Sequence, residues 1–113
     1  MQTNKLPSAA HYKFDVAWSP SDQEFVATVA EFPSVSWMAE DQVKALLGLR
    51  ELLEEIIVDL SANGEEIPQP YSERTYSGNI KLRVSPEKHR QLTIAAAEQG
   101  VSLNRYLSER LAS

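Results

Sequence analysis

The chain has 113 residues, of which 42% are hydrophobic and 24% charged, and it contains no cysteine. This length allows one modest domain or two small ones, and a chain without cysteine forms neither disulfides nor thiolate sites. Because no apolar run is long enough to cross a bilayer and the first residues lack the apolar segment of a signal peptide, we expect a cytoplasmic protein with no membrane partner.

The net charge of −5 is distributed unevenly along the chain. Residues 1–73 carry four basic and thirteen acidic side chains, a balance of −9, whereas residues 74–113 carry seven basic and three acidic ones, a balance of +4. An acidic surface repels nucleic acid and attracts basic proteins, and a basic surface does the reverse. The asymmetry therefore predicts two surfaces with different partners.

The first part of the chain has the pattern of three strands. Residues 12–18 alternate between apolar and polar side chains, residues 19–23 are typical of a turn, and residues 24–32 are rich in valine and phenylalanine up to Pro33. A short third strand is predicted at 35–38. Because the turn between the first two strands is compact, we expect them to pair antiparallel.

A long helix is predicted next, over residues 41–62, with Asn63-Gly64 as its stop. Its apolar side is expected to cover one face of the sheet, which gives a small α+β domain over residues 11–64. The residues expected on that side recur at spacings of three and four: Val43, Leu46, Leu47, Arg50, Leu53, Ile57 and Leu60.

Residues 65–77 contain Pro68 and Pro70 and have no periodicity, which is typical of a linker. The second domain is predicted to span residues 78–113. It begins with an alternating strand at 79–84, followed by a helix capped by Ser85 and a second helix capped by Ser102.

One strand and two helices cannot satisfy the strand's backbone or build an independent core. The economical solution is a homodimer in which the strands of two copies pair antiparallel and four helices enclose their apolar face. The sequence leaves open whether such dimers pair further into tetramers. The predicted dimer core consists of Ile80, Leu82, Val84, Leu92, Leu103, Tyr106 and Leu107.

The other face of that two-stranded ribbon would present Asn79, Lys81 and Arg83 twice. Such a ribbon fits the DNA major groove, where arginine and lysine reach guanine and asparagine reaches adenine. The start of the second helix, at Ser102 and Asn104, would direct backbone N–H groups toward phosphates. The sequence therefore predicts base contacts from the strand and phosphate contacts from the helix.

The stretch "SGNIKLRVSPEKHRQLTIAAAEQGVSLNRYLSERLA" resembles the ribbon-helix-helix tail of the HicB antitoxin family. The preceding portion, from "FVATVAEFP" to "NGEEIPQP", is similar to that family's N-terminal domain. The resemblance implies a truncated ribonuclease H-like fold for residues 11–64. It also implies an antitoxin that blocks a basic mRNA-cleaving toxin, HicA, through this domain and represses its own operon through the tail.

Two alternatives remain open at this stage. The first is a stand-alone ribbon-helix-helix regulator without a toxin, because residues 22–23 and 38–41 depart from the family pattern. The second is a residual nuclease, for which Asp15, Glu31 and either Glu51 or Glu54 are the candidate carboxylates. Since nothing in the sequence fixes their convergence, we expect a protein that is not an enzyme. We also expect no cofactor and no metal.

Overall fold

The computed structural model describes residues 6–112, which divide into two compact units, the first ending at Tyr76 and the second beginning at Ser77. The first contains a 3-10 turn η1 (Ala9–His11), strands β1 (Phe14–Ser19), β2 (Glu24–Val29) and β3 (Ser36–Ala39), helix α1 (Gln42–Ala62) and a second 3-10 turn η2 (Tyr71–Glu73). The second contains helices α2 (Pro86–Glu98) and α3 (Leu103–Ala112).

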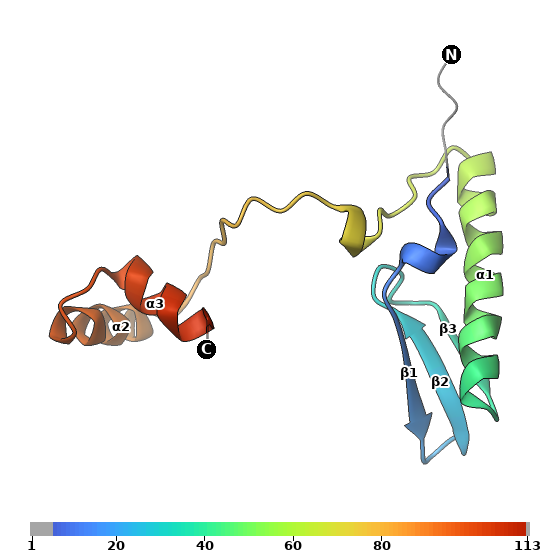
Figure 1. The fold of residues 1–113 in the computed structure, drawn as a ribbon, viewed down its shortest axis with the longest axis horizontal. Helices are drawn as coiled ribbons and strands as arrows, with labels where there is room; N and C mark the ends of the chain where they lie inside the picture. Colours follow the sequence, from blue (N-terminus) through green and yellow to red (C-terminus); the bar gives the residue numbers. More distant parts are fainter. Residues whose placement is uncertain (1–5, 113) are drawn as a thin grey trace. The chain divides into compact units, whose positions relative to one another are not determined.

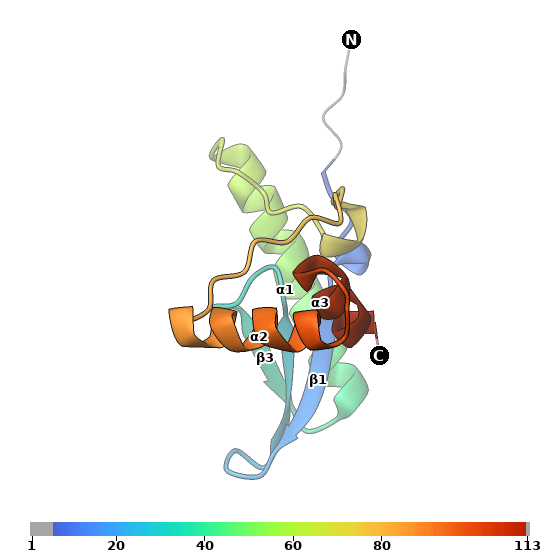
Figure 2. The same ribbon diagram turned by 90° about the vertical axis from the view of Figure 1, so that its left-hand side faces the viewer.

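The first unit is a two-layer α+β structure, as the sequence predicts. Its sheet has the order β1-β2-β3 with both pairs antiparallel. Helix α1 lies along one face of this sheet, and no α-helix among the described residues of the first unit covers the other (Figures 1 and 2). The sheet side that faces α1 carries the buried Ala27 and Val29, which with residues of α1 and η1 form the core.

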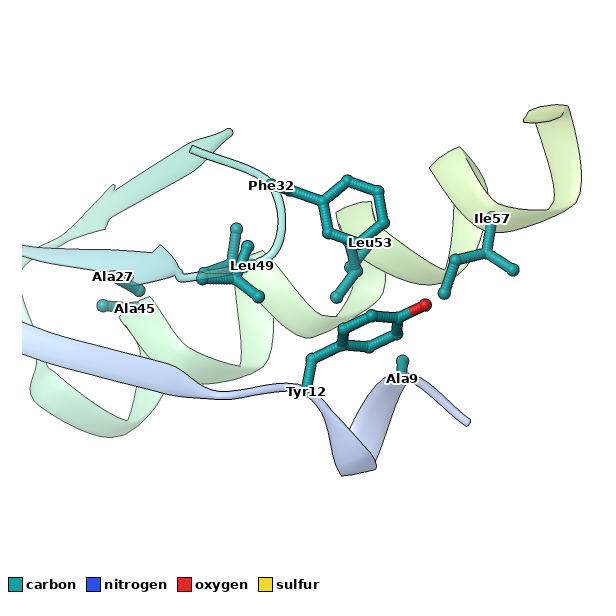
Figure 3. Packing of buried hydrophobic residues seen from close by; sticks show 9 residues of the cluster. Ala9, Tyr12, Ala27, Phe32, Ala45, Leu49, Leu53 and Ile57 are labelled. Carbon is teal, nitrogen blue, oxygen red and sulfur yellow. The ribbon is translucent and has the colours of Figure 1, made fainter. Parts of the chain in front are cut away.

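Helix α1 begins at an N-cap, Asp41, whose carboxylate accepts a hydrogen bond from the Lys44 N–H at 3.0 Å. Figure 3 shows its buried side chains against the sheet and η1. These lie at a regular spacing of four residues, which keeps one side of a helix toward the core. The buried residues of the helix are Ala45, Leu49, Leu53 and Ile57.

The helix is therefore rotated relative to the side predicted from its sequence. Val43 and Leu47, both expected to face the sheet, are 61% and 51% exposed. Gly48 explains part of this orientation, because a Cβ there would lie 2.0 Å from Nε1 of the Trp37 indole. Trp37 of β3 packs directly on the helix backbone at this glycine, and a larger residue would force the two apart.

Residues 67–74, which we call the strap, were predicted as part of a linker but belong to the first unit and are hydrogen-bonded to its other elements. The Tyr12 hydroxyl donates to the carbonyl of Pro68 at 2.5 Å, and Ser72 Oγ donates to the His11 carbonyl at 3.0 Å. His11 Nδ1 also pairs with the Glu73 carboxylate. Burial, and then the nearby Glu31 and Glu73 carboxylates, raise the pKa of the Tyr12 phenol above its usual value.

A buried carboxylate, Glu31, joins the strap to the sheet. Its oxygens accept hydrogen bonds from the backbone N–H of Lys13, at 3.1 and 3.4 Å, and from the backbone N–H of Tyr71, at 2.8 Å. Both N–H groups would lose this partner if the carboxylate were removed. Glu31 is therefore a structural residue that connects β1, the end of β2 and the strap.

Replacing Glu31 with alanine is expected to lower the free energy of unfolding of the first unit by about 1–3 kcal/mol, because it leaves two backbone donors unpaired. The measurement is urea unfolding of the full chain followed by tryptophan fluorescence, since Trp18 and Trp37 both lie in the first unit. Glu55→Ala on the exposed side of α1 is the control and should change stability by less than about 0.5 kcal/mol. Equal stability of the two variants would contradict the role assigned to Glu31.

Candidate nucleic-acid interface

The second unit is built from two capped helices. Ser85 Oγ accepts from the Lys88 N–H at 3.1 Å, with Pro86 as the first residue of α2, and Ser102 Oγ accepts from the Arg105 N–H at 3.1 Å at the start of α3. Gly100 turns the chain between the helices at a φ of 68°. The sequence predicted both caps and this turn, because each depends on local chemistry.

Residues 79–84 form neither helix nor strand in the single chain. A strand is defined by hydrogen bonds to a neighbouring strand, and no described part of this chain provides that neighbour. The strand predicted here depends on a second copy and stays a prediction. The apolar residues of the segment are open to solvent, with Ile80 82% and Leu82 72% exposed.

The predicted dimer core is only partly assembled within one chain. Tyr106 is buried, and its hydroxyl accepts from Arg110 Nη2 at 2.9 Å. Leu92, Leu103 and Leu107 are half-buried, and the three apolar residues of the 79–84 segment are exposed. Six of the seven predicted core residues thus retain exposed apolar surface, each with about 1.5–3 kcal/mol to gain at most from complete burial.

Two open hollows in the second unit mark where this surface lies. The first has a volume of about 330 Å³ and the second about 490 Å³. Both are lined by Leu82 and Leu107, so they adjoin the same apolar residues. The first is completed by Arg83, Val84, His89, Leu92 and Leu103, and the second by Gly78, Asn79, Ile80, Asn104, Ser108, Arg110 and Leu111.

The predicted base-contacting residues Asn79, Lys81 and Arg83 are all exposed. Lys81 and Arg83 make no ion pair with any described residue. By contrast, Arg90 donates to the Glu87 carboxylate at 2.7 Å, and this hydrogen bond holds the pKa of Glu87 below its usual value. The unpaired cations of the 79–84 segment are therefore more available to an anionic ligand than Arg90 is.

Ser102 and Asn104 lie at the exposed start of α3. The Ser102 side chain is engaged as the helix cap, and the first N–H groups of any α-helix lack intrahelical partners. Together with the positive end of the helix dipole, these groups suit an anion. The structure brings Asn104 to the same hollow as Asn79 and Ile80, which their separation in sequence does not reveal.

The carboxylates considered for a nuclease do not converge. Asp15 lies on the sheet face opposite α1, and Glu51 and Glu54 are on the exposed side of α1. Glu31 is held by backbone N–H groups. Among the described residues, no group of three or more histidine, cysteine, aspartate or glutamate side chains is arranged to hold a metal ion.

No helix among residues 6–112 has the length and apolar character needed to cross a bilayer. Neither the curated proteins nor the solved structures compared with the chain gave a match. The truncated ribonuclease H-like fold implied for the first unit therefore stays a prediction.

A family model, described as the HicB family, matches residues 62–111. The matched range begins at the last residue of α1 and includes the strap, the 79–84 segment, α2 and nearly all of α3. It thus covers the candidate interface completely. Over these residues the chain is similar to the HicB family, which confirms the resemblance predicted from the sequence.

Proposed function

We propose that this chain is the antitoxin and transcriptional autorepressor of a HicAB-type operon. The second unit dimerises through the 79–84 segment and binds operator DNA with Asn79, Lys81 and Arg83, while the start of α3 contacts phosphates. The first unit neutralises a basic mRNA-cleaving toxin. In this function the chain is a binding protein and not an enzyme.

One observation carries the DNA-binding part of the proposal. The 79–84 segment alternates between exposed apolar and exposed polar or basic residues, directly before two capped helices that leave hollows beside it. Pairing with a second copy would cover Ile80 and Leu82 and satisfy the segment's backbone. The same pairing would place four unpaired cations, two from each copy, on one surface.

The charge of the first unit supports the toxin-binding part. Residues 1–73 carry a balance of −9, which repels nucleic acid and favours fast association with a basic protein. The resemblance that the sequence shows to the family's N-terminal domain points to the same partner.

A stand-alone regulator is the second candidate function, and one observation favours it. The family match begins at residue 62, so it leaves the sheet and nearly all of α1 outside the matched range. In that case the second unit keeps its DNA-binding role, and the first unit serves another purpose.

Two assays of the full chain test the proposal. We expect a mobility shift of the DNA upstream of its own gene, competed poorly by unrelated DNA of equal length. We also expect the chain to restore growth to cells that express the small basic protein of the neighbouring gene. A specific shift without growth rescue would favour the stand-alone regulator, and the absence of both would reject the proposal.

A further inference from the structure

The sheet of the first unit has a face that no described α-helix of that unit covers, and we call it the outer sheet face. The strand register aligns its outward-pointing residues in rows across the strands. Ala17 pairs with Val26 and Val26 pairs with Met38, so these three form an apolar row across all three strands. On one side of this row lie Asp15, Thr28 and Ser36, and on the other side lie Ser19 and Glu24.

An uncovered face of an antiparallel sheet is normally polar. Here Met38, at the edge of the sheet, is 48% exposed, and the row that it ends contains no polar residue. Beside the row is an open hollow of about 400 Å³. It is lined by Lys13, Asp15, Thr28, Val29, Ala30 and Pro33. The outer sheet face therefore combines a continuous apolar row with space for a partner's side chain.

The charges on this face favour a cationic partner. Asp15 flanks the apolar row on one side and Glu24 flanks it on the other, and Lys13 lines the hollow together with Asp15. The surrounding unit is strongly acidic. A second copy of the chain would bring two acidic faces together, and that repulsion disfavours self-association through this surface.

Helix α1 also exposes apolar residues, but they do not run along its whole length. Val43 and Leu47 lie one turn apart near its start, and Val58 lies eleven residues beyond Leu47, roughly 16 Å along the helix. Val58 lies in a hollow whose other lining residues are Glu51, Glu54 and Glu55. Acidic side chains thus surround its single apolar residue, whereas the outer sheet face has its acidic residues at the margins, in the arrangement usual for a protein interface.

We propose that the outer sheet face is the surface that binds the basic toxin. An apolar side chain of the toxin packs on Val26 and Met38, and flanking lysine or arginine residues pair with Asp15 and Glu24. This inference rests on the proposed function, which assigns the toxin to the first unit, and adds the face and the chemistry by which the toxin is held.

The test compares two single-lysine variants of the full chain, Met38→Lys and Leu47→Lys. Both replace a half-exposed apolar residue and add the same charge, one on the outer sheet face and one on α1. Affinity for the purified toxin of the neighbouring gene is measured by calorimetry, and folding by tryptophan fluorescence. We expect Met38→Lys to weaken binding at least about tenfold and Leu47→Lys to change it less than about threefold.

Each other outcome rejects the inference in a distinguishable way. If the wild-type chain does not bind the toxin, the toxin-binding part of the proposed function fails and this inference fails with it. If the wild type binds and Met38→Lys binds equally well, or Leu47→Lys is the weaker variant, only the choice of face is wrong. If Met38→Lys instead changes the oligomeric state in light scattering and leaves toxin affinity unchanged, the face joins copies of this chain.

Discussion

An Ile80→Asp variant is expected to be monomeric and to lose DNA binding completely. In the single chain Ile80 is 82% exposed, so the substitution removes no contact that one copy needs for itself. In the proposed dimer the same position is enclosed by four helices, and each copy would bury an unpaired carboxylate at a cost of several kcal/mol. The first unit should be unaffected, because it is a separate compact unit.

Light scattering at micromolar concentration measures the loss of the dimer, and a mobility shift on the upstream DNA measures the loss of binding. Ile94→Asp is the matched control, since Ile94 is also an exposed isoleucine of the second unit but lies outside the predicted dimer core. It should leave both measurements near those of the wild type. A dimeric Ile80→Asp variant, or a wild-type chain that is already monomeric, would contradict the ribbon arrangement.

The sequence predicted the elements of the first unit because their signals are local. Alternation in residues 12–18, a turn at 19–23 and the helix stop at Asn63-Gly64 each depend on a few neighbouring residues. The orientation of α1 was less predictable. Val43 and Leu47 fit an apolar stripe as well as Leu49 does. The contact of Trp37 with Gly48 helps to determine which of these residues face the sheet, and it joins residues of two separate elements.

The strap shows why nonlocal contacts escape sequence patterns. Its prolines and lack of periodicity are typical of a linker, yet Tyr71 is held by Glu31 and Pro68 by Tyr12, from forty and fifty-six residues away. A single side chain hydrogen-bonded to a distant backbone group leaves no periodic signal. The apolar row of the outer sheet face did leave a signal in the sequence, because Ala17, Val26 and Met38 occupy strand positions where polar residues are expected.

The residues proposed for the candidate interface were selected from the sequence, and their role stays a prediction. Composition and alternation were sufficient to select Asn79, Lys81 and Arg83. Their pairing with a second copy depends on a molecule that one chain does not contain, so the single chain shows only the surface left uncovered. That surface has exposed apolar residues and open hollows. Substitutions of its apolar residues therefore test dimerisation, and substitutions of the polar and basic residues test DNA contact.

A double variant, Lys81→Ala with Arg83→Ala, is expected to dimerise normally but to lose sequence-specific binding. Each guanine contact removed costs about 1–3 kcal/mol, and a symmetric dimer loses every contact twice. Affinity for the upstream DNA should therefore fall at least about a hundredfold at fixed salt, and the preference over unrelated DNA should largely disappear. Neither side chain has an ion-pair partner among the described residues, so folding should be unchanged.

The matched control for this double variant is Lys88→Ala with Arg90→Ala, which removes the same charge from α2. This control variant should weaken binding to all DNA sequences about equally, because it lowers only the general attraction to phosphates. The loss of specific binding should be smaller than in the Lys81 and Arg83 double variant. Mobility shifts with specific and unrelated DNA at two salt concentrations separate the two effects. If the Lys81 and Arg83 double variant dimerises and keeps both its affinity and its preference, the 79–84 segment does not read the operator.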